Sequence, residues 1–190
     1  MKKKKIFENV GVQIVVDPNL HIMVDNMCSE WGNLPYPQLS VLLTHLKFIY
    51  LVHQNHHWTC KGDPFYGDHL LFQRLYEGVQ DEIDTVAEKA IGLGTSSNVE
   101  LMLQTSQVLR LVQGYGMSQT IPQPNEYAKR SLAAELNFLA CTSRLVDSLK
   151  ECGLLTRGLD NMIAGIEDKH ENHCYLLKQR CVSSIMLFTL

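Results

Sequence analysis

Apolar residues recur three and four positions apart over most of this chain, which is the spacing that one face of an α-helix requires. Glycine, proline and short polar runs divide the pattern into segments of helical length. The pattern predicts long helices over residues 37–60, 68–93, 125–152 and 159–182, and a shorter one after the helix-start sequence at 95–98. The predicted fold class is all-α: a four-helix bundle with a short extra helix in the crossover between the second and third helices.

The predicted second helix carries carboxylates along one side. Glu77, Asp81, Asp84 and Glu88 follow one another at offsets of four, three and four residues, so they share one helix face. Like charges stacked in this way repel one another unless a cation or a basic surface lies over them. Taken alone, a solvated acidic stripe is the simpler interpretation, because charged side chains usually face water.

Two histidines that precede these acids change the interpretation. His57 and His69 supply imidazole nitrogens, and nitrogen with carboxylate oxygen is the ligand set expected for iron or zinc. Fifteen helical positions separate His69 from Asp84, a rise of about 22 Å at 1.5 Å per residue. One chain therefore does not close a site from both pairs. Either no joint site exists, or a two-fold axis brings the histidines of one copy against Asp84 and Glu88 of another.

The same segment resembles the signature of the Dps family, the ferritin-like mini-cages known as DNA-binding proteins from starved cells. The family pattern is a His-Trp pair, a second His twelve residues after the first, and a later Asp-x-x-x-Glu. About forty residues match it specifically, and they include His57-Trp58, Phe65, His69, Asp84, Ala87-Glu88 and the closing Gly92 and Gly94. The general layout of residues 36–181 fits this family as well, and implies a ferritin-like bundle.

The resemblance also implies a function. In this family the histidines and the acids come from different subunits and form a ferroxidase centre at a dimer interface. His57, His69, Asp84 and Glu88 are then the expected iron ligands and catalytic residues, with a di-iron centre at the interface. Peroxide is the expected oxidant and dioxygen a slower one. The product is stored as ferric mineral in a hollow homododecamer built from two-fold dimers, which protects DNA from oxidative damage.

Trp58 and Gln73 are two further positions in the signature. The resemblance makes Trp58 an electron donor beside the iron, although an indole that fills the dimer core is explanation enough for a tryptophan there. Gln73 stands where the family usually has another carboxylate, four residues after the second His. A neutral amide is a poor iron ligand, so Gln73 is only a weaker ligand candidate. The other weaker candidates are Glu77, acting through water, and Asp81.

An intrachain di-iron oxidase is an alternative function. Glu167 and His170 match the Glu-x-x-His pair of intrachain di-iron bundles, and Glu135 on the predicted third helix is a suitable partner. Only half of such a site is present, because the first helix has no acidic residue between Ser40 and Trp58 and the second has no Glu-x-x-His.

The predicted first helix carries three more histidines. We interpret His45, His53 and His56 as packing or surface residues without an assigned role, because single histidines are more often these than metal ligands. His53 lies one turn before His57, where it is placed to orient that ligand.

A DNA-compacting cage with little ferroxidase activity is the other alternative. The basic tail Lys2, Lys3, Lys4 and Lys5 is the candidate contact for DNA. The formal net charge is only −3, so the whole chain has no basic field for nucleic acid, and in a single chain such a tail is more simply a solubilising terminus. A twelve-fold cage would display the tail many times, and weak phosphate contacts then add up.

The chain divides into three regions. Residues 1–35 are interpreted as a basic tail and an extended arm with a helical turn near 20–31, residues 36–182 as the ferritin-like domain, and residues 183–190 as an apolar tail. The six cysteines include no C-x-x-C pair, and neither a secretory signal nor an apolar run long enough to span a bilayer is found. We expect a cytoplasmic protein with reduced thiols and no membrane contact.

Overall fold

The computed structural model describes residues 18–115 and 124–181, and the regular elements in these ranges are helical. They are, in order, α1 (Leu20–Glu30), α2 (Pro37–Thr59), α3 (Phe65–Leu93), the 3-10 helix η1 (Ser96–Val99), α4 (Leu101–Gly114), α5 (Pro124–Glu151) and α6 (Arg157–Cys181). The predicted all-α class with a short crossover helix is confirmed. The lysine tail, Lys2–Lys5, and the apolar segment 183–190 lie outside the described residues.

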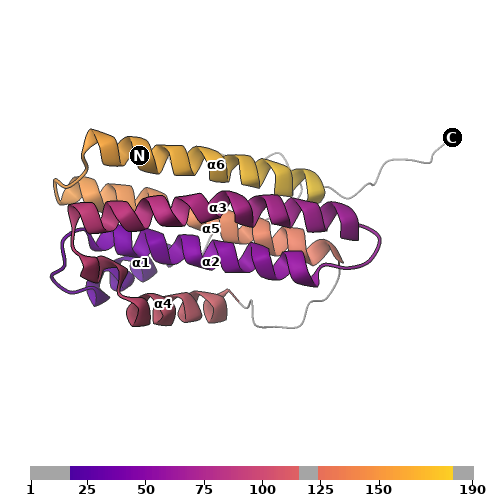
Figure 1. Ribbon diagram of the computed structural model, residues 1–190, viewed down its shortest axis with the longest axis horizontal. Helices are drawn as coiled ribbons and strands as arrows, with labels where there is room; N and C mark the ends of the chain where they lie inside the picture. The colour runs from indigo at the N-terminus through magenta and orange to yellow at the C-terminus, as the bar shows by residue number, and fades with distance from the viewer. Residues whose placement is uncertain (1–17, 116–123, 182–190) are drawn as a thin grey trace.

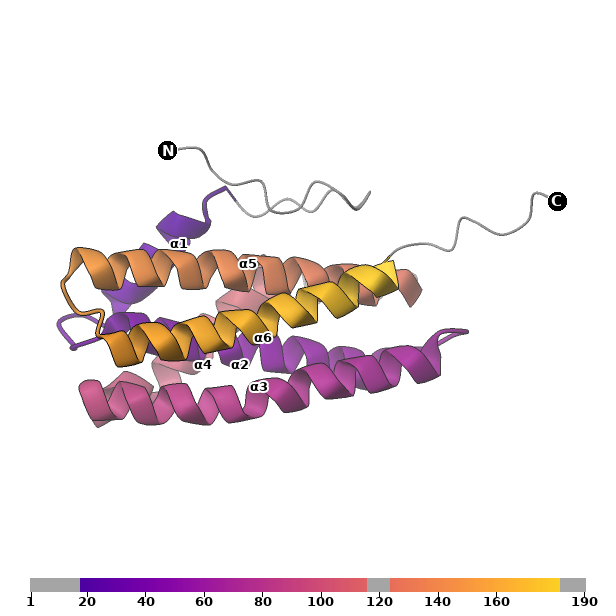
Figure 2. The ribbon, with the colours of Figure 1, turned by 90° about the horizontal axis from the view of Figure 1, so that it is seen from above.

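The helices α2, α3, α5 and α6 lie side by side as a four-helix bundle (Figures 1 and 2). A short loop joins α2 to α3 and another joins α5 to α6, so the helices of each pair run antiparallel. A long crossover that contains η1 and α4 joins α3 to α5, and one such crossover is typical of ferritin-like bundles. The helix α4 packs on α2, and α1 packs on α5 and α2. None of the described helices is long and apolar enough to cross a membrane.

The helix α3 shows how the sequence determines the inward face of the bundle. Leu75, Val79, Val86 and Ala90 are fully buried, and they recur at helical spacing. Position 82 falls on the same stripe, and Glu82 is buried with them. The bundle interior therefore contains a charged residue as well as an apolar core.

The helical turn expected near residues 20–31 is a regular helix, α1, of 11 residues. Leu20, Val24 and Met27 lie about one turn apart and are buried against the bundle. Burying these three side chains on one helix face stabilises α1 over an extended chain. Arg144 of α5 donates two hydrogen bonds to the Asp25 carboxylate, at 2.8 and 3.0 Å, and so ties α1 to the bundle.

The crossover begins with a capping box, at the helix-start sequence that was predicted. The Thr95 hydroxyl accepts a hydrogen bond from the Ser97 N–H at 3.3 Å, and Asn98 Oδ1 accepts one from the Thr95 N–H at 2.9 Å. Asn98 is buried, and its amide also donates to the Pro35 carbonyl at 2.7 Å and to Ser40 Oγ at 3.1 Å. One asparagine thus joins the start of the crossover to the start of α2.

Gly94, directly after α3, lies too close to its neighbours to carry a side chain. A Cβ there would lie 2.7 Å from the Ala90 carbonyl oxygen and against the Asn98 side chain. We expect Gly94→Ala to lower the free energy of unfolding by about 1–3 kcal/mol, the usual cost of overpacking. Thermal unfolding midpoints would measure the change.

Gly92→Ala is the matched control, because a Cβ at Gly92 would meet nothing within 4 Å. Alanine is the better helix former by up to about 1 kcal/mol, so this substitution should be neutral or stabilising. Equal losses from the two substitutions would contradict the packing described for Gly94.

Candidate functional site

The two predicted histidine ligands lie together where the loop between α2 and α3 closes. His57 is in the last turn of α2, and His69 is in the second turn of α3. Their rings stack with centroids 3.7 Å apart. The Nδ1 atom of each ring lies 2.9 Å from the backbone carbonyl oxygen of the other residue. The loop therefore pairs two imidazoles that are twelve positions apart in the chain.

The reciprocal hydrogen bonds determine the chemistry of both rings. A carbonyl oxygen only accepts, so each neutral ring carries its proton on Nδ1 and donates it, while Nε2 keeps its lone pair. Metal-binding histidines are usually oriented by such a bond from the other ring nitrogen. Within residues 18–115 and 124–181, no hydrogen-bond partner occupies Nε2 of His57 or His69. Both rings are thus prepared to bind a metal through Nε2.

Aromatic side chains surround the histidine pair. The Tyr76 ring lies edge-on to His57 with centroids 5.3 Å apart, and the Phe65 ring lies 5.1 Å from that of His69. Trp58 is 66% exposed, so its indole fills no core within one chain. The predicted roles of Trp58, in a dimer core or as an electron donor, both depend on a second chain or on bound iron.

The predicted acidic ligands lie far from the histidines on the same unbroken helix, α3. His69 and Asp84 are separated by about 22 Å of helix rise, and Asp84 and Glu88 are both exposed. Glu88 lines a shallow pocket together with Thr85 and Lys89. One chain does not bring the four predicted ligands together, and their joint site stays a prediction about two chains.

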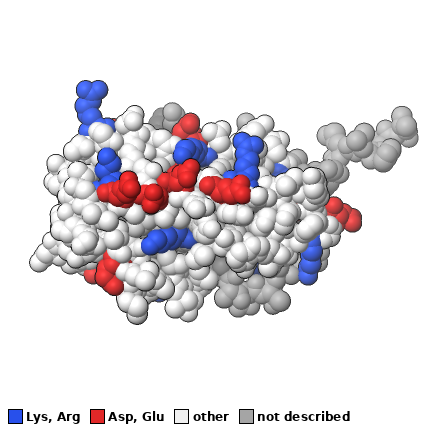
Figure 3. Space-filling view, viewed as in Figure 1, with Lys and Arg blue, Asp and Glu red and all other residues white. Residues whose placement is uncertain are grey.

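The weaker ligand candidates lie between these two ends of α3. Glu77 and Asp81 are exposed, and Figure 3 shows acidic side chains in a row across the face on which α3 and α6 lie, with lysines and arginines beside them. Gln73 donates its amide to Glu77 Oε1 at 2.8 Å. Gln73 and Glu77 therefore form a pair one turn beyond the histidines.

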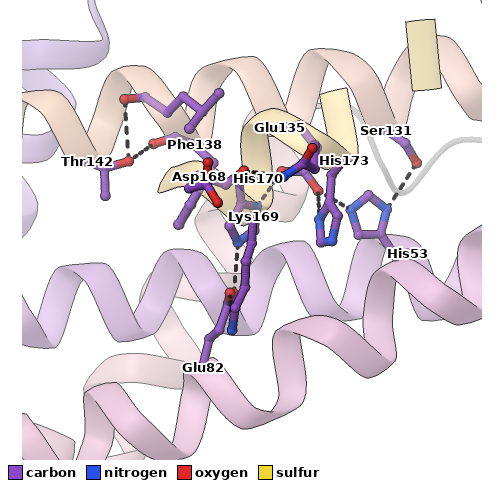
Figure 4. A network of polar contacts seen from close by, with 12 residues as sticks. His53, Glu82, Ser131, Glu135, Phe138, Thr142, Asp168, Lys169, His170 and His173 are labelled. Atoms are coloured by element: carbon purple, nitrogen blue, oxygen red, sulfur yellow. Dashed lines mark hydrogen bonds and ion pairs between the residues drawn. The ribbon is translucent and has the colours of Figure 1, made fainter. Parts of the chain in front are cut away.

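A second group of metal-capable side chains lies inside the bundle. The carboxylate of Glu135 on α5 is fully buried and faces three imidazoles (Figure 4). His53 Nε2 lies 2.6 Å and His173 Nδ1 lies 3.1 Å from Oε1 of this carboxylate, and His170 Nδ1 lies 2.5 Å from Oε2. One ligand atom each of His53, Glu135 and His173 lie within 4.8 Å of one another. These three side chains are close enough together to hold a metal ion.

His170 bridges two buried carboxylates, because its Nε2 also lies 3.0 Å from Oε2 of Glu82 on α3. Burial would lower the pKa of this imidazole, but Glu135 and then Glu82 raise it to about 9. Burial would likewise raise the pKa of Glu135, but the charge of His170 and the hydrogen bonds of the three histidines hold it well below its usual range. The interior thus contains an imidazolium paired with carboxylates, and Lys169 approaches Glu82 at 3.3 Å.

His53 and His56 of α2 share one serine of α5. Ser131 Oγ lies 3.2 Å from His53 Nδ1 and 2.8 Å from His56 Nδ1. Burial lowers the pKa of both rings, that of His56 to about 3, so both imidazoles are neutral near pH 7. The predicted support of His57 by His53 is wrong, because the ring nitrogens of His53 contact Ser131 and Glu135 instead.

The buried group contains only part of the intrachain site that the sequence predicted. Glu135 and His170 contact each other directly, as expected for such a site. Glu167 has no hydrogen bond or ion pair with either of them among the described residues. It is half-buried, and burial together with the neighbouring carboxylate of Glu171 raises its pKa. Glu167 is therefore not part of the buried group.

Three members of the buried group were missed by the sequence analysis: Glu82, His53 and His173. A signal for Glu82 was present in the apolar pattern, because Val79 and Val86 mark the inward stripe of α3 and position 82 lies between them. An inward carboxylate requires inward partners, and that requirement would have pointed to the histidines of the facing helices.

Comparison of the sequence with known proteins finds partial matches. No model of a known protein family matches the chain. The nutrient stress-induced DNA-binding protein of Nostoc sp. is 39% identical over 56 residues, which are 30% of this chain and 30% of that protein. The DNA protection during starvation protein of Helicobacter pylori is 33% identical over 57 residues, which are 28% of this chain and 40% of that protein. The matches thus span less than half the length of either relative.

Solved structures match over most of the chain. An archaeal Dps homologue from Halobacterium salinarum superposes with a TM-score of 0.65 at 13% identity, over 86% of both chains. The Dps protein of Vibrio cholerae, described as a member of a broad superfamily of ferritin-like diiron-carboxylate proteins, superposes with a TM-score of 0.62 at 17% identity, over 84% of this chain and 91% of its own. At these identities the similarity establishes the ferritin-like fold.

Glu135→Gln removes the charge that pairs with the buried His170 imidazolium. We expect it to lower the free energy of unfolding at pH 7 by about 3–5 kcal/mol, the usual cost of breaking a buried ion pair. A carboxyl with a lowered pKa stabilises fully above its unfolded-state pKa, here 4.5, and this contribution is lost as the pH falls. The difference from the wild type should therefore shrink below about pH 4.5. Denaturant titrations at pH 7 and pH 4 would measure it.

Glu167→Gln is the control, because it is the same substitution at a half-buried carboxyl with a raised pKa. This variant should lose less than about 0.5 kcal/mol at pH 7, as is usual away from buried networks. Similar losses in the two variants would show that Glu135 is not the central acceptor of the buried network.

Proposed function

We propose that this chain, which belongs to the Dps family, oxidises Fe²⁺ at sites that two copies build together, stores the ferric product and thereby protects DNA. The observation that carries this proposal is the arrangement of His57 and His69. Their reciprocal hydrogen bonds hold both rings with Nε2 available, which is the preparation that a metal site requires. Iron is the substrate of this reaction.

A second copy must supply the acids, because α3 keeps Asp84 and Glu88 about 22 Å or more from His69. A two-fold axis that runs two α3 helices antiparallel would bring the histidines of each chain to the acids of the other. Exposed apolar side chains on α2 and α3 support such a contact, since interfaces cover large exposed apolar groups; they include Leu51, Trp58, Phe65, Leu70 and Ile91. Dimers of this kind would assemble into the hollow homododecamer that the family resemblance implies.

In the proposed reaction, the electrons lost by iron equal those gained by peroxide. Two Fe²⁺ ions each give up one electron, and one hydrogen peroxide molecule takes up both electrons and two protons to form two water molecules. Asp84 and Glu88 favour the ferric product, because their negative charges stabilise the additional positive charge. His57 and His69 orient the iron through two neutral nitrogens. A two-electron reduction of peroxide avoids the release of hydroxyl radicals.

The hydrogen bond of Gln73 affects which side chain can supply an oxygen ligand to a second iron. Its amide is held by Glu77 at 2.8 Å, so the carboxylate that the family usually has here is replaced by a hydrogen-bonded pair. We infer that Glu77 supplies the oxygen for a second iron, through water, and that Asp81 is too far along the exposed stripe to contribute directly. Trp58, which is exposed beside His57, is the proposed electron donor.

Mixing two inactive variants tests the shared site. In a co-assembly of His57→Ala and Glu88→Ala chains, each mixed dimer combines one doubly damaged site with one intact site. Random pairing of equal amounts makes about half of the dimers mixed, so about one quarter of wild-type peroxide-dependent Fe²⁺ oxidation should return. Stopped-flow absorbance of the ferric product would measure it.

Each variant alone should be nearly inactive, and a mixture of separately assembled cages should stay so. A co-assembly of His57→Ala with His69→Ala is the control for subunit exchange, because both variants damage the same half of the site and every site remains defective. Recovery in this control, or none in the first mixture, would contradict a site shared between two chains.

We further infer that the cage contacts DNA through its lysine tails. The Nostoc relative is named a DNA-binding protein, and Lys2, Lys3, Lys4 and Lys5 give each chain a basic tail, which lies outside the described residues. Each neutralised phosphate adds about 0.9 to the slope of log affinity against log salt. Replacing all four lysines by serine should therefore lower this slope by several units for a cage that applies several tails at once.

Gel shifts of duplex DNA at a series of salt concentrations would measure the slope. The serine variant keeps the tail length, so a lower slope reports charge rather than missing chain. An unchanged slope would place the DNA contact elsewhere on the cage or remove it from the proposal. Iron oxidation should be the same in both proteins, because the tail contributes no ligand.

A further inference from the structure

We propose that each bundle holds a divalent transition-metal ion of its own, bound by His53, Glu135 and His173 within a single chain. This site goes beyond the proposed function, because it uses none of the residues of the shared site and needs no second copy. Two imidazole nitrogens and one carboxylate oxygen are a ligand set that suits Zn²⁺, Fe²⁺ and Co²⁺.

The ligands come from three helices and meet at one point of the interior (Figure 4). His53 Nε2 of α2 and His173 Nδ1 of α6 both face Glu135 Oε1 of α5, at 2.6 and 3.1 Å. Around an ion with ligand bonds of about 2.0–2.2 Å, tetrahedral ligand atoms lie about 3.4 Å apart. The observed atoms are within 4.8 Å of one another, so small side-chain movements create the space for an ion.

The groups behind the ligands are already in position. Ser131 Oγ lies 3.2 Å from His53 Nδ1, so it accepts the ring proton when Nε2 binds the metal. His170 Nδ1 donates to Glu135 Oε2 at 2.5 Å, which leaves Oε1 for the ion. Such outer hydrogen bonds orient metal ligands and raise their affinity.

Access to the site runs past His173. Its side chain is 12% exposed, whereas those of His53 and Glu135 are fully buried. Its Nε2 lies beside Gly78 of α3, where an added Cβ would be 3.5 Å away. An ion that enters from solvent would therefore meet His173 first, and a buried metal site requires such an entry path.

A hydrogen-bond network without metal is the competing explanation for the same side chains. Glu135 already accepts from three imidazoles, and the imidazolium of His170 supplies a compensating charge. The two explanations differ in one measurable property, because only a metal site makes His53 and His173 necessary for binding a cation.

Cobalt binding tests the proposal in full-length protein that lacks the shared site. The double variant His57→Ala with His69→Ala should still bind about one Co²⁺ per chain. Its visible spectrum should show ligand-field bands of nitrogen and oxygen ligands, without the sulfur-to-cobalt charge transfer that coordination by nearby Cys174 would give. Adding Ser131→Ala should weaken Co²⁺ binding roughly 10-fold, as expected for loss of an outer partner. Adding His173→Ala should weaken it more than about 100-fold, beyond that range.

Two further variants keep the outcome interpretable. His21→Ala removes an exposed histidine on α1 and should leave binding unchanged. His173→Gln retains a group that can donate to Glu135 and so preserves folding, which circular dichroism would confirm, but it should lose the metal. Absence of bound Co²⁺ in the double variant, or binding that is unaffected by His173→Ala and His173→Gln, would overturn the interior site. Neither result would alter the co-assembly experiment, which depends only on the shared ligands.

Discussion

The interior of the bundle is organised by the need to satisfy one buried carboxylate. Glu135 lies in the core with no exposed surface, where a charge without partners would cost several kcal/mol. The helices α2 and α6 satisfy it with imidazoles, and α3 joins through Glu82 and the bridging ring of His170. The four helices of the bundle are thus joined by this polar cluster as well as by apolar packing. Because Glu135, Glu82, His53 and His170 are buried, the loss of one removes a hydrogen-bond partner from its neighbours, which makes the cluster more specific about helix arrangement than apolar packing alone.

The two groups of metal-capable residues differ in whether one chain completes them. The interior group is closed, since its ligands face one another across three helices. The pair of His57 and His69 is open, since its hydrogen bonds satisfy Nδ1 and leave Nε2 without a partner in the described chain. The proposed interior site would be complete in an isolated subunit, whereas the proposed function requires the open pair to receive its acids from a second copy. Under these two proposals, oligomerisation is required for the shared site and not for the interior site.

The sequence predicted the helices well because their apolar period is regular and Gly, Pro and capping residues mark their ends. It also predicted the histidine pair, because a recognisable local signature holds His57 and His69 in one short stretch.

The sequence-based prediction failed for His53, which was placed beside His57 from helix spacing alone. It also failed for Glu167, which shares a turn with His170 but has no hydrogen bond or ion pair with Glu135 among the described residues. Contacts between α2, α5 and α6 join residues about 35 to 80 positions apart, and no local pattern encodes which inward polar residues will meet. The helix α1 was underestimated, because its apolar face becomes visible as such only when the bundle that buries it is known.

The geometry of α3 explains how one helix serves both groups. Successive residues on a helix are rotated by about 100°, so Glu82 faces the interior while its neighbours Asp81 and Asp84 face solvent. The inward residue acts through His170, and the outward acids remain available to a second copy. Because α3 is continuous from Phe65 to Leu93, the histidine end and the acidic end stay at a fixed separation. That separation excludes a site built from both ends of one α3 helix, and the proposed site therefore uses two such helices run antiparallel. Under these proposals, the continuity of α3 divides the chemistry between the single chain and the assembled pair.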